Sequence, residues 1–255
     1  MAGKAAGSGV QSVERVFELL EIITDAGGAV TLSELAASTD LPLPTIHRLL
    51  RTLVSLGYAR QLPNRRYTLG PRLIPLGEGA VKQLGSLALP QLKTLVDELG
   101  ETANIAVLDS DMVVYLAQVP SPHSMRMFTE VGRRVHPHAT GVGKAILAQL
   151  PDDRVRDIVA RSGMPTPTDK TIGTVDELLA ELQRIRKRGY AIDEQEQELG
   201  VRCFAIAVPD APTPTAVSVS GPISRVDAGF AKRAVPLLRS AAESISQEFN
   251  GQSHG

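Results

Sequence analysis

The sequence contains no tryptophan and few other aromatic residues, since aromatic residues make up only 4% of its 255 positions. A hydrophobic core of this chain must therefore be aliphatic, and a hydrophobic content of 43% is enough for one large domain or two modest ones. The single cysteine, Cys203, excludes an internal disulfide bond and favours a reducing compartment. No stretch approaches the roughly 18 apolar residues that a membrane-spanning helix needs.

The N-terminal segment MAGKAAGSGVQS also lacks the apolar core of a signal peptide. Its small and polar residues predict a disordered N-terminus over residues 1–10. We therefore expect a soluble cytoplasmic protein with no membrane partner. The net charge of −1 neither indicates nor excludes a nucleic-acid partner, because the local distribution of charge decides this.

Acidic residues are absent from residues 41–76, although the whole chain has 28 Asp and Glu residues against 27 Lys and Arg residues. This stretch carries six arginines, namely Arg48, Arg51, Arg60, Arg65, Arg66 and Arg72. A basic run is usually a solvated surface, so the secondary structure around it decides its meaning.

Apolar residues spaced by three and four predict a helix over residues 44–56, which begins at Pro44 and stops at Gly57. Its apolar face comprises Ile46, Leu49, Leu50, Leu53 and Leu56. Its opposite face carries Thr45, Arg48, Thr52 and Ser55, with Arg51 beside it. Two short strands, over residues 58–62 and 66–69, are predicted to follow as a basic hairpin.

A second helix is predicted just before this one, over residues 32–39, because Thr31 and Glu34 match a capping box. A turn at residues 40–42 joins the two short helices into a helix-turn-helix unit. With a preceding helix over residues 12–25 and the hairpin, residues 11–70 are predicted to form a winged helix-turn-helix domain. The apolar face of the preceding helix is expected to comprise Val13, Val16, Phe17, Leu20 and Ile23.

In a helix-turn-helix, the second helix lies in the major groove of double-stranded DNA and its first residues reach the base edges. We therefore expect Thr45, His47 and Arg48 to contact bases, and most of the other arginines to contact phosphates. The alternative for each arginine is a solvated surface charge. The predicted DNA-contacting residues are Pro44, Thr45, His47, Arg48, Arg51, Thr52, Arg60, Arg65 and Arg66.

A linker helix is predicted over residues 71–86, with an apolar stripe that makes it a candidate dimer contact. The alternative is that this helix packs on its own domain. Its stripe comprises Leu73, Leu76, Ala80, Leu84 and Leu87. Residues 87–250 then mix strand-like and helical segments, which predicts an α+β domain with an antiparallel sheet. Strands are expected over 102–108, 112–119, 125–135, 201–208 and 216–220, and helices over 90–99, 140–150, 152–160, 175–188 and 228–249.

The run Gly141-Val142-Gly143-Lys144 has some likeness to a phosphate-binding loop, but His138 and Ala145 stand where that motif needs a glycine and a Ser or Thr. One interpretation is simply a glycine-rich helix start. The other is that the free N–H groups of Gly141, Val142 and Gly143 hold a small anion such as a carboxylate.

The runs QSVERVFELLEII, TLSELAASTDLPLPTIHRLLRTLVSLGYARQ and YTLGPRL resemble the winged helix-turn-helix of the IclR family of bacterial transcription regulators. The runs GRRVHPHATGVGKAILA, RGYAIDEQEQELGVRCFAIAV and AVSVSGP resemble the GAF-like effector-binding domain of the same family. Together these motifs cover residues 11–247. Within the family, ETANIAVLD, SMRM and HATGVGKA most resemble the AllR-like branch, which represses genes of allantoin and glyoxylate use and binds glyoxylate.

The resemblance implies a repressor that acts as a homodimer or a tetramer on a pseudo-palindromic operator and responds to a small carboxylate. By position in the motifs it implies Asp193, Cys203, Ser218 and Ser220 as effector-binding residues. Ser218 and Ser220 are two apart on a strand, so they share a face, and an ionised Asp193 suits an effector hydroxyl. Without the resemblance, Cys203 reads as a core residue and Asp193 as a turn residue.

Catalysis, cofactors and metals are not expected. His123, His136 and His138 lie within 16 residues but no further ligand pattern accompanies them. Two other functions remain open. A nucleophilic enzyme would use Cys203 or Ser220 with His138 and Asp193, but no nucleophile motif is present. A sensor that acts through a protein partner, or that binds a larger or aromatic acid, is the second alternative.

Overall fold

The computed structural model describes residues 10–84, 86–127, 130–227 and 229–252. The chain forms two compact units that meet in sequence between Ala80 and Val81. Of residues 1–10, for which disorder is predicted, residues 1–9 lie outside the described residues. Among the described residues, no helix combines the length and apolar character needed to cross a bilayer.

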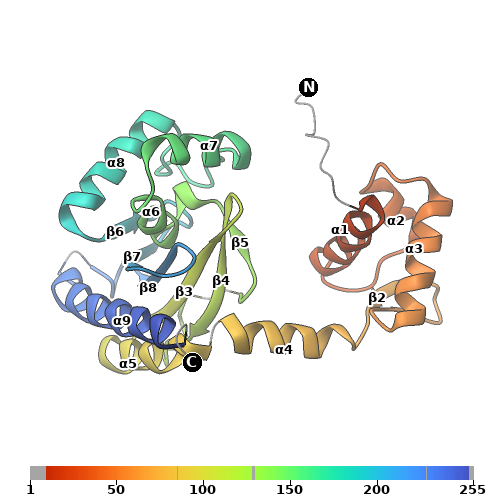
Figure 1. Ribbon diagram of the computed structural model, residues 1–255, viewed down its shortest axis with the longest axis horizontal. Helices are drawn as coiled ribbons and strands as arrows, with labels where there is room; N and C mark the ends of the chain where they lie inside the picture. Colours follow the sequence, from red (N-terminus) through yellow and green to blue (C-terminus); the bar gives the residue numbers. More distant parts are fainter. Residues whose placement is uncertain (1–9, 85, 128–129, 228, 253–255) are drawn as a thin grey trace. The chain divides into compact units, whose positions relative to one another are not determined.

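The N-terminal unit is a winged helix-turn-helix (Figure 1). Its elements are α1 (Gln11–Asp25), α2 (Leu32–Ala37), α3 (Leu43–Leu56), β1 (Ala59–Gln61) and β2 (Tyr67–Leu69). The two strands pair antiparallel, and Val30 adds a single bridge to Tyr67. The three helices and the hairpin close over one aliphatic core that includes Leu19, Leu35 and Leu50. This confirms the fold predicted for this part of the chain.

The buried face of α1 differs from the expected one. Leu20 and Ile23 are buried as expected, but Val13 and Phe17 are 52% and 57% exposed and Leu19 is buried instead. The apolar residues of α1 extend around more than one side of the helix, and the small core of this unit accepts only the stripe that faces α3 and β2.

The C-terminal unit is built on a six-stranded antiparallel sheet of order β5-β4-β3-β8-β7-β6. Its strands are β3 (Thr102–Asp109), β4 (Met112–Val119), β5 (Arg134–Val135), β6 (Ala191–Glu194), β7 (Val201–Val208) and β8 (Thr215–Pro222). Its helices are α5 (Leu89–Leu99), α6 (Gly141–Leu147), α7 (Asp152–Ser162), α8 (Val175–Arg188) and α9 (Ala231–Gln252), with short 3-10 turns η1 (Ser86–Ala88) and η2 (Pro137–Ala139). α4 (Leu73–Leu84) contains the junction between the units.

Helices cover both faces of this sheet (Figure 1). α5 and α9 pack on one face over odd-numbered residues of β8 such as Val217 and Val219. α6 and α8 lie on the other face over Ala205 and Ala216. Because side chains alternate along a strand, the even-numbered residues of β8, Ser218 and Ser220 among them, face α6. The sheet therefore separates a mainly apolar layer from one that contains several buried polar groups.

Two predictions about elements need correction. The strand expected over residues 125–135 is confined to Arg134–Val135, and residues 128–129 lie outside the described residues. β6 was missed, because four residues are too short for a visible alternation. On the predicted linker stripe Leu76 is 59% exposed, and the side chains of Ala80 and Leu84 lie outside the described residues.

Candidate functional site

α3 presents a polar, basic face to solvent. Ile46, Leu50 and Leu53 are buried in the core of the unit, and this fixes which side of the helix points outward. The exposed side carries the residues predicted to meet DNA, with Thr45 half-buried and Pro44, His47, Arg48, Arg51 and Thr52 exposed. Pro44 lies in the first turn, as expected, and the helix ends at Gly57 in the left-handed conformation.

The hairpin after α3 places two of its arginines in solvent. Arg60 lies on β1 opposite Thr68, and Arg65 lies at the tip with a positive φ of 63°. Both are exposed, and neither has a salt-bridge partner among the described residues. They remain available for phosphates.

Arg66 behaves differently from the other arginines of the hairpin. Its Nε donates to the carbonyl oxygen of Ala29 at 2.8 Å, and its Nη2 lies 3.2 Å from Oε2 of Glu34. The phosphate contact predicted for Arg66 therefore competes with two contacts inside the unit. We assign this side chain to holding the hairpin against the start of α2.

The second candidate site lies on the α6 face of the C-terminal sheet. Strand register places Asp193 of β6 beside Cys203 of β7, Cys203 beside Ser220 of β8, and Ser220 beside Thr102 of β3. Ser218 lies in the next row. All five side chains are buried. Asp193, Cys203 and Ser220, which the motifs implied as effector-binding, come from distant segments and form one continuous polar row.

The start of α6 lies directly over this row. A Cβ atom added to Gly141 would come within 2.9 Å of the Cys203 sulfur, so only glycine permits this approach. Gly143 approaches Pro137 even more closely, since an added Cβ would lie 2.2 Å from the Pro137 carbonyl oxygen. The structure thus brings the Gly141–Gly143 segment and the polar row together.

The predicted anion nest needs one correction. The N–H of Gly143 donates to Oγ1 of Thr140 at 3.1 Å, because Thr140 is the N-cap of α6. This N–H is not free for a ligand. The N–H groups of Gly141 and Val142 have no such bond among the described residues, and they remain the predicted donors.

Asp193 has a structural contact as well as its place in the row. Its Oδ1 accepts the N–H of Glu196 at 2.7 Å and that of Gln197 at 3.4 Å, which closes the turn after β6. Burial raises the pKa of Asp193 to about 7, while the two N–H donors and Lys144 act in the opposite direction. Asp193 can therefore be protonated near neutral pH, whereas the sequence suggested a simple ionised acceptor.

Cys203 is unsuited to nucleophilic chemistry. Burial, together with the nearby Asp193, raises the pKa of its thiol to about 12. Its thiolate is therefore scarcely populated at neutral pH. His138 donates through Nε2 to the Pro165 carbonyl oxygen at 2.9 Å and is fully buried, and burial lowers its pKa. The arrangement offers buried polar groups but does not form a nucleophile and base pair.

Sequence reasoning missed four polar residues near this row. Asn104 donates to Ser220 Oγ at 3.4 Å and accepts from Gln118 at 3.1 Å. Lys144 pairs with Glu196 in the interior. Tyr115 lies close enough to Cys203 and Asp193 for both to act on its pKa, which burial raises. The one indication of these residues in the sequence is Lys144, which stands among the small residues at the start of α6.

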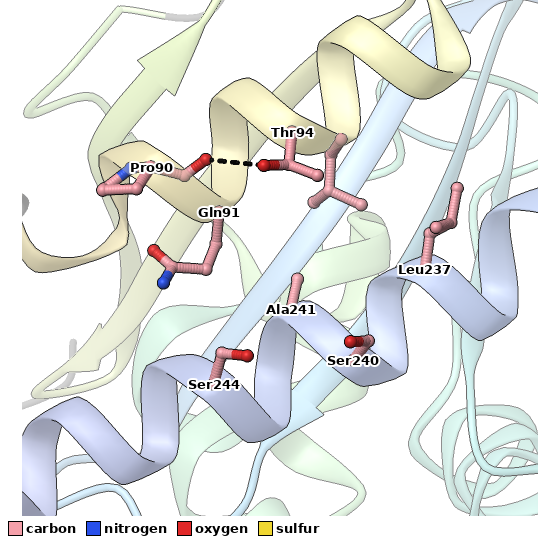
Figure 2. Close-up of a pocket in the computed structure, with 8 residues that line it drawn as sticks. Pro90, Gln91, Thr94, Leu237, Ser240, Ala241 and Ser244 are labelled. Atoms are coloured by element: carbon pink, nitrogen blue, oxygen red, sulfur yellow. Dashed lines mark hydrogen bonds between the residues drawn. The ribbon is translucent and has the colours of Figure 1, made fainter.

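Cavities lie on both faces of the sheet. One of about 370 Å³ is lined by Met125, Arg126, Met127, Leu199, Val201 and Pro222, among others. Val201 and Pro222 pair with each other and are two residues from Cys203 and Ser220, so this cavity lies beyond the polar row toward the strand ends. Another, of about 250 Å³, lies between α5 and α9 (Figure 2). None of the side chains that line it carries a charge, so it does not suit a carboxylate.

A winged helix-turn-helix followed by a unit with a buried polar site defines the class of ligand-responsive transcription regulators. Family comparisons agree. The model for the C-terminal domain of bacterial IclR transcriptional regulators matches residues 80–247, and the IclR helix-turn-helix model matches residues 12–63. The chain belongs to the IclR family.

Individual relatives are regulators too. The chain is 36% identical to the transcriptional repressor IclR of Escherichia coli over 95% of its length and 91% of the relative. It is 29% identical to the transcriptional repressor AllR of the same organism, over 99% of this chain and 95% of the relative. The crystal structure of an IclR regulator from Alicyclobacillus acidocaldarius matches with a TM-score of 0.83 at 28% identity, covering 94% of this chain and 98% of that one. These comparisons do not single out the AllR-like branch.

Proposed function

We propose that this IclR-family regulator is a repressor that binds a pseudo-palindromic operator as a homodimer or tetramer and responds to a small carboxylate. The observation that carries the DNA-binding part is the outward face of α3 beside a hairpin with two unpaired arginines. Recognition helices of two subunits would enter successive major grooves about 34 Å apart.

The effector part rests on the polar row beneath α6. Two backbone N–H groups and the hydroxyls of Ser218 and Ser220 offer donors to one carboxylate, and Asp193 offers an acceptor or, when protonated, a donor. A site with one Asp and no unpaired cation in the row favours a short monocarboxylate with a second polar group. Glyoxylate, the effector implied by resemblance to the AllR-like branch, is such a molecule.

A second candidate effector is a larger or aromatic acid. The cavity of about 370 Å³ favours it, because Met125, Met127 and Leu199 offer an apolar lining next to Arg126, and Glu198 is the one acidic residue of that lining. Such a regulator would control a different catabolic operon.

A thermal-shift screen separates the two candidates, since a ligand of the native state raises the apparent melting temperature with concentration. Glyoxylate, pyruvate, allantoin, allantoate, short hydroxy acids and hydroxybenzoates are the test compounds. Shifts with short acids, lost in Ser220→Ala, support the proposal. Shifts confined to aromatic acids would replace it with the second candidate.

DNA binding is tested with DNA from upstream of the chain's own gene, by fluorescence anisotropy at several salt concentrations. Arg48→Ala is expected to lose affinity for the operator by about 1–3 kcal/mol, with a smaller loss on random DNA. Arg60→Ala is expected to weaken all sequences alike and to reduce the salt slope by about one. Arg154→Ala, an exposed arginine of α7, is the control and should bind as the unchanged protein does. Equal losses on both DNAs for Arg48→Ala would remove its base-reading role.

A further inference from the structure

Lys144 and Glu196 form a buried ion pair at the candidate effector site. Lys144 is 1% exposed and Glu196 6%, and the ammonium of Lys144 donates to Oε1 of Glu196. A buried lysine is rare unless its charge is paired. Lys144 lies three residues after Gly141, and Glu196 lies three residues after Asp193. The pair therefore joins the two segments that supply the backbone donors and the carboxyl of the site.

Glu196 is held from several sides. Its N–H donates to Asp193, and its carbonyl oxygen accepts from the hydroxyls of Thr171 at 2.6 Å and Thr168 at 3.2 Å. Gln195 before it has a positive φ of 65°, a conformation that a non-glycine residue adopts only when its surroundings impose it. The turn after β6 is thus held in one conformation, and Lys144 of α6 contacts it through Glu196.

The charges of this cluster do not balance. One ammonium, that of Lys144, faces two carboxyl groups, those of Asp193 and Glu196, and Oε2 of Glu196 is buried without a hydrogen-bond partner among the described residues. The other titratable groups around it are Cys203 on β7, Tyr115 on β4 and His138 on η2. Burial raises the pKa of Cys203 and Tyr115 and lowers that of His138, so all three are neutral. With both carboxyl groups ionised the cluster has a net negative charge, which one bound proton neutralises.

We propose that Lys144 and Glu196 are positioning residues of the effector site, which fix the start of α6 over the Asp193 turn and link binding of an anionic effector to uptake of one proton. This inference rests on the proposed small-carboxylate effector. An effector anion beside Asp193 favours its protonated form. Because the pKa of buried Asp193 is about 7, affinity for the anion falls as the pH rises through neutrality.

The test compares the unchanged protein with the double variant Lys144→Met/Glu196→Gln, which removes both charges and leaves neither stranded in the interior. Dissociation constants for glyoxylate and pyruvate are measured by calorimetry from pH 5.5 to 8.5. At pH 5.5, where Asp193 is protonated in both proteins, the double variant is expected to bind at least tenfold more weakly. The midpoint of the pH profile is expected to move upward, because Lys144 lowers the pKa of Asp193 more than Glu196 raises it.

An ion pair that only stabilises the fold would leave the dissociation constant at pH 5.5 unchanged. Asp193→Asn is expected to abolish the pH dependence, and Arg161→Met, which breaks the exposed Arg161–Asp111 pair on the same unit, serves as the matched control. An unchanged dissociation constant at pH 5.5 with an unchanged midpoint in the double variant would overturn the proposal.

A measurement without ligand distinguishes failure of the positioning role from failure of the proposed effector class. Amide hydrogen exchange of residues 141–145 and of Glu196 and Gln197 is expected to be at least fivefold faster in the double variant than in the Arg161→Met control. If neither acid binds the unchanged protein but exchange accelerates, the effector class is wrong and the positioning role stands. Unchanged exchange would overturn the positioning role.

Discussion

At Asp193, desolvation and hydrogen bonding act in opposite directions on one carboxyl group. Burial disfavours the charged form and has the largest effect, while the N–H groups of Glu196 and Gln197 and the ammonium of Lys144 favour it. The pKa of about 7 is the result. The same residue thus closes a turn and can hold a proton near neutral pH.

This shift makes stability depend on pH. The unfolded chain releases the proton near its ordinary pKa of 3.8, whereas the folded chain keeps it until about pH 7. Between these values the folded state binds more protons, so this contribution to stability is complete below about pH 4 and is lost as the pH rises through 7. Asp193→Asn keeps an Oδ1 acceptor for the turn. At pH 8 its free energy of unfolding is expected to exceed that of the unchanged protein by an amount on the order of a few kcal/mol. Its free energy of unfolding should also vary less with pH.

Scanning calorimetry from pH 4.5 to 8.5 measures this, because each unit of the chain can give its own transition. Asp169→Asn, an exposed aspartate of the same unit, is the control and should follow the unchanged protein. A steep loss of stability toward pH 8 that persists in Asp193→Asn would assign the effect to another group.

At the scale of elements, the start of α2 connects two parts of the DNA-binding unit. Glu34 accepts the N–H of Thr31 at 2.6 Å and donates its own N–H to Thr31 Oγ1 at 3.1 Å, which completes the capping box expected from the sequence. The same carboxylate pairs with Arg66 of the hairpin. The Thr31 bonds and the Arg66 charge lower the pKa of Glu34, so this contribution to stability is lost as the pH falls through that lowered pKa.

Thr31→Ala removes the side-chain half of the capping box. We expect α2 to lose about 1 kcal/mol of local stability, which corresponds to roughly fivefold faster exchange of its amides. Hydrogen exchange of the full chain, read over residues 32–37 and 59–69, measures it. The hairpin should also loosen, because Glu34 is no longer fixed for Arg66. Ser38→Ala at the other end of α2 is the control, and equal acceleration in both variants would count against a special role for the cap.

The elements that the sequence predicted well are those whose pattern is long. α8 was predicted with its observed bounds, because its apolar period runs for 14 residues between the cap Thr174 and Gly189. β7 and β4 were also predicted within their observed bounds. β6, with four residues, had no readable period, although it carries Asp193. The pairing of Lys144 with Glu196 was invisible, because only the fold brings residues 52 positions apart into contact.

At the scale of the whole molecule, the two candidate sites lie in different compact units. α4 runs across the junction, with Leu73 packed on the core of the first unit. The sequence predicted this order of domains, and the residues that it assigned to each site stay predictions. It could not predict that the N–H of Gly143 and the side chain of Arg66 were already occupied, since both find their partners only in the folded chain.

Two sites on one chain make a reciprocal prediction. If the effector changes operator affinity by some factor, then operator DNA must change effector affinity by the same factor, typically about 5- to 150-fold. Anisotropy gives operator affinity with and without saturating glyoxylate, and calorimetry gives glyoxylate affinity with and without operator. The two ratios are expected to agree. Arg48→Ala/Arg60→Ala should keep the affinity of the free chain for glyoxylate but lose the response to operator. Ratios that differ at one protein concentration and converge at another would show that the effector acts by changing the number of subunits in the assembly.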